Sequence, residues 1–191
     1  MKSYKKGEYG YLKKYRNSKL IASIVFLLLI AFIVATVIIM FGDTKRVAIV
    51  FAILMALPLA KFIIAYILCL KFKPLTMEDY EYIKANSKDC FKDLSFDISI
   101  TQYEGAKFYP AMLIKNGKVY AFVYDKNFSS KKKEYETWIK NTFSDTKYEY
   151  KVFVTDKLDV YVKKINSVSE ANRNNKLIDV YIKELIFEKG V

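Results

Sequence analysis

The chain has 191 residues, enough for one or two small domains, and its 32 Lys and Arg residues against 20 Asp and Glu residues give a net charge of +12. It contains no His, which excludes His-based catalytic triads and metal sites. Two cysteines, Cys69 and Cys90, are too few for a disulfide framework or an all-Cys zinc site. The charge alone suggests nucleic-acid binding, but its distribution along the chain indicates something else.

Two long apolar runs lie near the N-terminus. Residues 20–41 contain no charged residue, and residues 47–70 contain only Lys61. A helix over the first run is roughly 33 Å long, which is sufficient to cross a hydrocarbon core of about 30 Å. A signal peptide is the alternative for this run, but its apolar region is too long and no small-residue cleavage site follows it. We therefore predict a transmembrane hairpin over residues 20–70, with residues 42–46 as the connection.

The basic residues around the hairpin predict its orientation. Residues 1–19 carry a net charge of +6, the connection 42–46 carries +1, and Lys71 and Lys73 follow the second run. Lys and Arg favour the cytoplasmic side of a membrane. We expect a two-pass plasma-membrane protein with both termini in the cytoplasm and residues 71–191 as a cytosolic domain.

Small residues recur at every fourth position in both predicted membrane helices. They are Ala31 and Ala35 in the first helix, and Ala48, Ala52, Ala56 and Ala60 in the second. Such stripes let helix backbones approach closely, so they predict packing of the two helices on each other or self-association of the chain. Ordinary apolar composition is the alternative interpretation.

Lys61 is the one charged residue inside the second apolar run. A charge at the centre of a bilayer costs about 2.5–3.5 kcal/mol on insertion scales. One interpretation is a cation that lines a pore or binds a partner in an oligomer. The other, which we favour, is a lysine whose alkyl stem extends towards the cytosolic headgroups.

The N-terminal segment 1–19 interleaves tyrosines with its basic residues. The tyrosines are Tyr4, Tyr9, Tyr11 and Tyr15. Aromatic and basic side chains next to a membrane helix are typical of contact with anionic headgroups. RNA contact through Tyr stacking is the alternative, and we favour the lipid because the segment directly precedes an apolar run.

Residues 71–191 predict one α+β domain with a mostly antiparallel sheet flanked by helices. Helices are expected over 76–85, 131–143 and a C-terminal stretch marked by 178–186, and strands over 94–100, 107–115, 118–124 and 148–154. Candidate helix N-caps are Thr76, which has Asp79 three residues on, and Ser167, which has Glu170 three residues on. Ser129 or Ser130 is a further candidate N-cap. Asn116-Gly117 predicts a tight hairpin turn. Residues 157–165 fit either a strand or a helix, and we favour the helix.

No local catalytic motif is present, and no cofactor or metal site is predicted. Cys90 has no His to activate it, so we expect it to be a small buried residue. The expected order of helix, three strands, helix and strand resembles the core of PD-(D/E)xK nucleases in topology. That resemblance implies an acid near the start of the second strand and (D/E)xK on the third. Residues 107–115 contain no acid, and Glu149-Tyr150-Lys151 falls on the fourth strand, which leaves a degenerate nuclease-like domain as a third possibility.

A run of three lysines, Lys131, Lys132 and Lys133, occupies the expected start of a helix after Ser129 and Ser130. Cations are unfavourable at a helix N-terminus, so this conflict suggests a site for a phosphate-bearing ligand or a lipid headgroup. A solvated run balanced by Glu134 and Glu136 is the alternative.

Two classes of function remain. The first is a membrane-anchored, non-catalytic cytosolic module acting as a sensor, scaffold or regulatory subunit. The second is an oligomeric two-helix membrane effector or small pore gated by its cytosolic domain, with a further copy or another membrane protein as partner. An enzyme comes third. Nucleic acid is not favoured, because most of the excess charge lies beside the apolar runs, and the Lys-, Ile-, Asn- and Tyr-rich usage is typical of AT-rich bacterial genomes.

Overall fold

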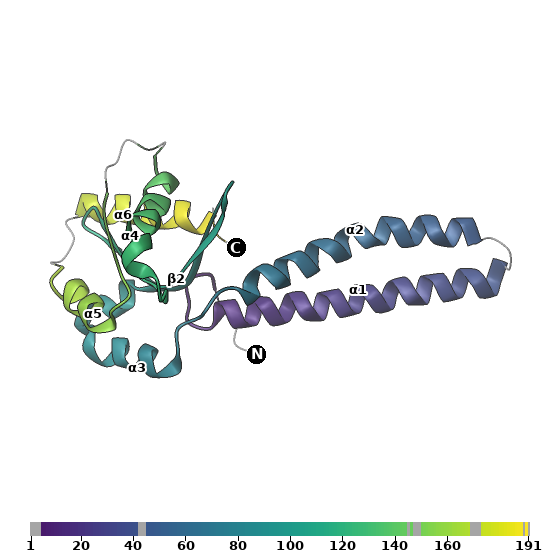
Figure 1. The fold of residues 1–191 in the computed structure, drawn as a ribbon, viewed down its shortest axis with the longest axis horizontal. Helices are drawn as coiled ribbons and strands as arrows, with labels where there is room; N and C mark the ends of the chain where they lie inside the picture. Colours follow the sequence, from purple (N-terminus) through teal and green to yellow (C-terminus); the bar gives the residue numbers. More distant parts are fainter. Residues whose placement is uncertain are drawn as a thin grey trace. The chain divides into compact units, whose positions relative to one another are not determined.

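A computed structural model gives the fold and describes residues 5–41, 45–144, 146, 150–168, 173–188 and 190 (Figure 1). The chain forms two compact units. One is Leu12–Phe72, and the other combines Met1–Tyr11 with Lys73–Val191. The second unit is therefore built from both ends of the chain, and we call it the α+β domain.

The first unit is an antiparallel pair of helices, α1 (Tyr11–Phe41) and α2 (Lys45–Leu70), as the two apolar runs predict. The rings of Phe26 and Phe62 lie 5.2 Å apart between the helices. The Lys19 ammonium lies 5.2 Å from the centre of the Phe62 ring. Helix α1 begins at Tyr11, so residues 11–19 add more than two helical turns before the apolar run. The connection 42–44 lies outside the described residues.

The apolar side chains of this pair are largely exposed. Only 6% of the most apolar 18-residue stretch of each helix is buried. The side chains of Phe32, Ile39 and Leu57 have exposed fractions of 71%, 82% and 72%. Both helices are long and apolar enough to cross a membrane. A core helix of a soluble domain buries such a surface, so the described residues leave the apolar faces of α1 and α2 to be covered by something outside the chain.

The α+β domain contains a mixed sheet in the order β1-β2-β3-β4. Its strands are β1 (Ser95–Gln102), β2 (Gly105–Lys115), β3 (Lys118–Phe122) and β4 (Lys151–Thr155). The first three strands pair antiparallel, whereas β3 and β4 are parallel and are joined through helix α4 (Phe128–Thr142). The predicted α+β class is confirmed, and the parallel pair follows from the long crossover connection.

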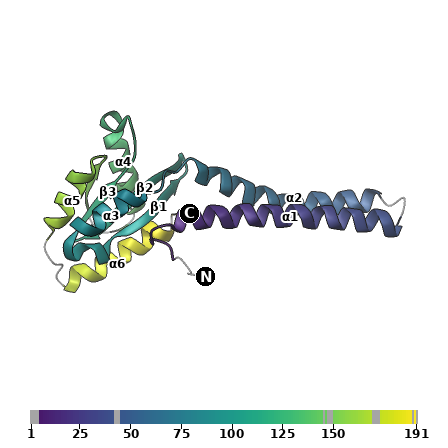
Figure 2. The ribbon, with the colours of Figure 1, turned by 90° about the horizontal axis from the view of Figure 1, so that it is seen from below.

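Helices cover both faces of the sheet (Figure 2). Helices α4 and α6 (Arg173–Glu188) pack on one face, over Ile100 and Val119 among others. Helices α3 (Met77–Asn86) and α5 (Leu158–Asn166), with the short helix η1 (Lys88–Asp93), pack on the other face, over Leu113 and Phe122 among others. Because successive side chains of a strand point to opposite faces, each strand supplies both cores.

Several local predictions are confirmed. Thr76 caps α3 by accepting a hydrogen bond from the Asp79 N–H at 3.1 Å. Residues 157–165 belong mainly to helix α5, and Cys90 is buried with 7% exposure. Residues 147–149 and Glu170 lie outside the described residues, so the early part of the predicted fourth strand and the Ser167–Glu170 cap stay predictions.

The predicted start of α4 is wrong. The helix begins at Phe128, which places Ser129 and Ser130 inside its first turn rather than at the N-cap. The reason is a local acid: a side-chain oxygen of Asp125 accepts the Asn127 N–H at 2.9 Å and turns the chain three residues earlier than expected.

The Asn116-Gly117 turn between β2 and β3 is held by a buried carboxylate on α6. Both turn residues have positive φ, 54° and 66°, as a type I′ turn requires. Asp179 is only 8% exposed and accepts the Asn116 N–H at 2.8 Å, the Gly117 N–H at 3.4 Å and the Tyr150 hydroxyl at 2.9 Å. This carboxylate therefore connects the hairpin turn, α6 and the segment before β4.

Replacing this carboxylate is expected to destabilise the domain. Asp179→Ala removes the acceptor of three donors in a buried site and should lower the free energy of unfolding by about 2–3 kcal/mol. The emission of Trp138, the only tryptophan, follows unfolding of the full chain in detergent. Glu184→Ala, at an exposed position of the same helix, is the matched control and should change stability by less than about 0.5 kcal/mol. Equal stability of the two variants would contradict the structural role of Asp179.

Candidate functional site

The most distinctive site is the junction where residues 5–10, which we call the N-terminal clasp, pack on the α+β domain. Strand β1 is an edge strand, and its Phe96 N–H donates to the Gly7 carbonyl at 2.8 Å. One residue on, the Asp97 carboxylate accepts the Gly10 N–H at 3.0 Å. Asp97 is 4% exposed and has φ of 54°, a conformation unusual inside a strand. The clasp thus covers part of an otherwise open sheet edge.

Lys6 joins the clasp to the C-terminal end of α6. Its ammonium donates to the carbonyls of Phe187 and Gly190, each at 2.7 Å. Carbonyls at a helix C-terminus lack helical partners and carry the negative end of the helix dipole, so a cation is favourable there. Partial burial of the ammonium lowers the pKa of Lys6.

Gly7 permits this close approach. It has φ of 89°, and a Cβ atom at this position would lie 2.6 Å from the ring of Phe187. Any other residue would therefore strain the backbone and displace that ring.

An aromatic stack completes the clasp. The rings of Tyr9 and Tyr80 lie 4.1 Å apart at an interplanar angle of 19°, and the Phe96 ring meets Tyr9 edge-on at 6.3 Å. Burial raises the pKa of Tyr9 above its ordinary value. The sequence predicts contact of Tyr9 with headgroups or RNA, but the structure instead uses this ring in packing within the domain. Tyr4 lies outside the described residues.

The chain is also fixed where it re-enters the domain after α2. Leu75 is 3% exposed in the core under α3 and α5. Next to it, the Thr76 N–H donates to the Tyr124 hydroxyl at 3.4 Å, and that hydroxyl donates to the Asp79 carboxylate. Burial, together with the hydrogen bond to Asp79, raises the pKa of Tyr124 to about 12. The helix pair α1–α2 is therefore flanked in the chain by two segments that are packed on the domain.

Two of the three lysines at the start of α4 lie near carboxylates. Asp125, two residues before the N-cap Asn127, accepts the Tyr135 hydroxyl at 2.9 Å and lies 3.7 Å from the Lys131 ammonium. The hydrogen bond from the Asn127 N–H is the main reason that the pKa of Asp125 is lowered. Lys132 lies 3.9 Å from Glu136, whereas Lys133 is exposed. Asp125 thus lies beside the start of the lysine run, and binding of a phosphate or lipid headgroup by Ser129, Ser130 and the three lysines stays a prediction.

The residues singled out in the apolar runs lie on exposed helix surface. Lys61 is exposed on α2, as are Ala56 and Ala60, and on α1 Ala31 and Ala35 are exposed too. Ala52 is half-buried, and the side chain of Ala48 lies outside the described residues. Contact between α1 and α2 involves the bulkier Phe26 and Phe62 instead of a seam of alanines. The alternative use of the alanine stripe, self-association, stays a prediction.

The described part of the chain contains no group of three or more Cys, Asp or Glu side chains arranged to hold a metal ion. The order α3-β1-β2-β3-α4-β4 matches the topology that suggested a nuclease-like core. Strands β2 and β3 carry no carboxylate at the positions that such nucleases use, and Glu149 lies outside the described residues.

Comparison with protein families, curated proteins and solved structures finds no match for this chain. The residues of the clasp are consequently assigned from the structure alone. Lys6, Gly7, Asp97 and Asp179 escape sequence reasoning because their contacts join segments far apart in the chain. Within the basic segment, the local sequence signal of a fixed conformation is its two glycines, Gly7 and Gly10. Both have positive φ in the structure.

Loss of the Lys6 ammonium is expected to loosen the clasp. Lys6→Met keeps the aliphatic stem but removes two charge-assisted hydrogen bonds, so amide hydrogen exchange over residues 7–10 should accelerate roughly tenfold. Lys5→Met is the matched control, because the Lys5 side chain is exposed and the hydrogen bonds that join Lys5 to Glu8 come from its backbone N–H and carbonyl. Unchanged exchange in Lys6→Met would contradict the proposed fastening of the clasp to α6.

Proposed function

We propose that this protein is a two-pass membrane protein whose α+β domain acts on the cytoplasmic side as a non-catalytic sensor, scaffold or regulatory module. One observation supports the proposal above all: α1 and α2 are long, apolar and exposed along their length. Exposing such apolar surfaces to water costs free energy, whereas contact with the lipid hydrocarbon does not. The second helix argues against a signal peptide, since a cleaved leader needs one apolar segment only.

The charges support the cytoplasmic orientation. The net charge of +6 over residues 1–19 and the basic Lys71 and Lys73 flank the apolar pair at the side of the domain, whereas residues 42–46 carry only +1. The positive-inside rule places the more basic flanks in the cytoplasm. Anionic lipid headgroups are then the natural neighbours of the basic residues of α1 that precede its apolar run, Lys13, Lys14, Arg16 and Lys19.

The clasp suggests how such a module works. Residues 5–10 and 75–76 are both fixed on the domain, and they directly flank the membrane helices in the chain. A change in the domain that releases one segment frees one end of the helix pair. We propose that this link carries information between the domain and the membrane, in either direction.

Membrane integration is testable with apolar and charged substitutions at matched positions. The wild-type chain should stay in the membrane fraction at alkaline pH. The double variant Ile24→Asp with Leu28→Asp places two charges at exposed apolar sites, each costing about 2.5–3.5 kcal/mol in lipid, so a smaller share of it should stay in that fraction. The control, Ile24→Leu with Leu28→Ile, should behave like wild type. Phosphatase fusions should be active after Asp43 and inactive after Val191. Release of the wild-type chain as a soluble protein would contradict the proposal.

The second candidate function, an oligomeric effector or small pore, rests on the exposed alanines and on Lys61. Small side chains that face away from the partner helix are available to a second copy of the chain. In an oligomer, Lys61 would line the shared interior, whereas in a monomer its ammonium reaches towards the headgroups.

The mass of the detergent-solubilised chain separates the two candidates. A strict monomer eliminates the pore. If an oligomer forms through the alanine stripe, Ala56→Leu with Ala60→Leu should shift the mass towards the monomer, because bulky side chains prevent close approach of the helices. Leu57→Ile, at an equally exposed neighbour, should leave the mass unchanged.

A further inference from the structure

We propose that the exposed face of helix α6 is a self-association surface, through which the α+β domains of two copies of this chain pair about a two-fold axis at Val180. The surface consists of five exposed residues, Lys176, Leu177, Val180, Tyr181 and Glu184. It lies within the α+β domain and does not depend on what covers α1 and α2, so the inference goes beyond the proposed membrane anchoring.

Three large apolar or aromatic side chains are exposed next to one another on α6. Leu177, Val180 and Tyr181 have exposed fractions of 71%, 55% and 47%. Their spacing of three and four residues places them on one face of the helix. The opposite face of α6 is already in use, because Ile182 and Ile186 are fully buried in the core that the helix shares with the sheet. The packing of α6 on the sheet therefore leaves a second apolar face uncovered by the described residues.

Helix α4 shows the composition of a solvated helix face in the same domain. It packs on the same face of the sheet as α6, and its exposed side chains are polar, among them Lys133, Glu134, Thr137 and Lys140. All residues of α4 are described, and none of its large apolar side chains is exposed. The apolar face of α6 is thus a feature of this helix and not of the domain surface in general, as is typical of an interaction site.

The charges at the two ends of this face have opposite signs. Lys176 precedes Val180 by four residues and Glu184 follows it by four, so each charged residue lies about 6 Å from Val180 along the helix axis. Both side chains are exposed, and neither forms an ion pair with another described residue. The apolar centre of the face is therefore flanked by a cation and an anion at equal distances.

This pattern is complementary to itself, which identifies a second copy of the chain as the partner. When two α6 helices lie antiparallel with Val180 opposite Val180, Lys176 of each copy faces Glu184 of the other. Leu177 of one copy is then about 3 Å along the helix axis from Tyr181 of the other, so the apolar side chains also meet. A parallel arrangement would instead place lysine opposite lysine and glutamate opposite glutamate. The charges therefore favour the antiparallel pair.

The small size of this surface indicates a weak, reversible dimer. A single helix face on each copy corresponds to the low end of protein interfaces, below about 1,200 Å² in total. An exposed ion pair contributes little, so removal of one charge has a small effect. Reversal of a charge has a larger effect, because it places like charges opposite each other at two symmetric positions of the dimer. A covalent trap combined with charge reversal is therefore suited to detect the pairing.

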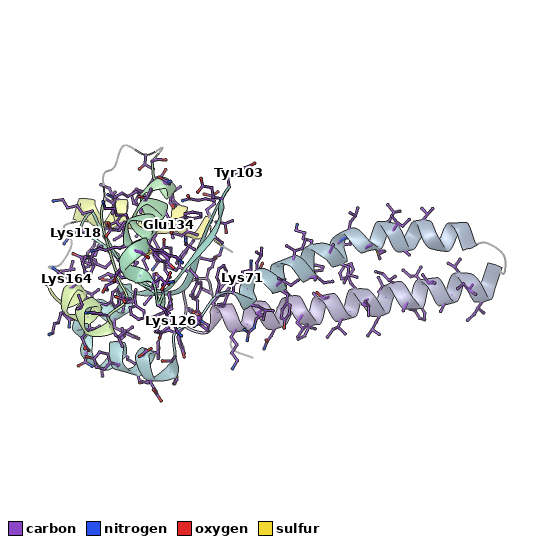
Figure 3. All side chains as sticks on the ribbon, in the orientation of Figure 1. Lys71, Tyr103, Lys118, Lys126, Glu134 and Lys164 are labelled. Carbon is purple, nitrogen blue, oxygen red and sulfur yellow. The ribbon has the colours of Figure 1, made fainter. Side chains whose placement is uncertain are left out.

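Disulfide trapping tests the pairing in the full chain in detergent. Val180→Cys places a thiol at the two-fold axis, and the control is Lys164→Cys, at an exposed site on α5, which packs on the other face of the sheet (Figure 3). Both native cysteines are buried, and the wild-type chain measures any cross-linking through them. After mild oxidation, the fraction of disulfide-linked dimer on a non-reducing gel should be at least about fivefold larger for Val180→Cys than for Lys164→Cys, because only thiols near the axis come within bonding distance of their copies.

Charge reversal in the Val180→Cys background tests the antiparallel arrangement. Lys176→Glu and Glu184→Lys should each lower the dimer fraction roughly fivefold, because like charges then face each other. Mixing the two variants should restore cross-linking, since each mixed pair regains two Lys–Glu contacts, and a misfolded variant could not produce this restoration. Equal trapping at positions 180 and 164, unchanged trapping in the single charge variants, or no restoration in the mixture would overturn the proposal. Self-association through the alanines of α2 would not respond to these charges.

Discussion

The attachment of residues 5–10 to strand β1 is the constraint on which the arrangement of this protein depends. One main-chain hydrogen bond to Phe96, one carboxylate contact from Asp97 and the Lys6 ammonium on α6 fasten the start of the chain to a domain that otherwise begins after residue 72. Without these contacts α1 would be connected to the domain only through α2. With them, both ends of the helix pair continue directly into fixed backbone.

The local patterns of the sequence predict most of the secondary structure. Alternation of Phe96, Ile98 and Ile100 identifies β1, Asn116-Gly117 identifies the turn, and Thr76 identifies the start of α3, because each signal acts within a few residues. The parallel β3–β4 pair follows from the intervening helix. The start of α4 escapes prediction, since the acid that sets it, Asp125, lies outside the expected cap positions.

The candidate site is far less predictable, because its contacts join the two ends of the chain. Nothing near Lys6 indicates that its ammonium meets carbonyls 181 and 184 residues away. Asp97 sits in an alternating strand pattern that assigns it to a solvent face, yet it is buried against Gly10. The basic segment 1–19 is also divided in a way that its composition does not indicate. Lys6 and Tyr9 belong to the α+β domain, whereas the basic residues from Lys13 onwards belong to helix α1.

The two segments that flank the helix pair in the chain are both held by contacts within the α+β domain. Gly10 is bonded to Asp97, and Thr76 is bonded to Tyr124. The clasp contains four hydrogen bonds to the rest of the domain and one aromatic stack, contributions of about 1 kcal/mol each, so its total of about 5 kcal/mol exceeds the 1–3 kcal/mol of typical allosteric coupling. A ligand that released the clasp would therefore have to bind the released form more than about a thousandfold better.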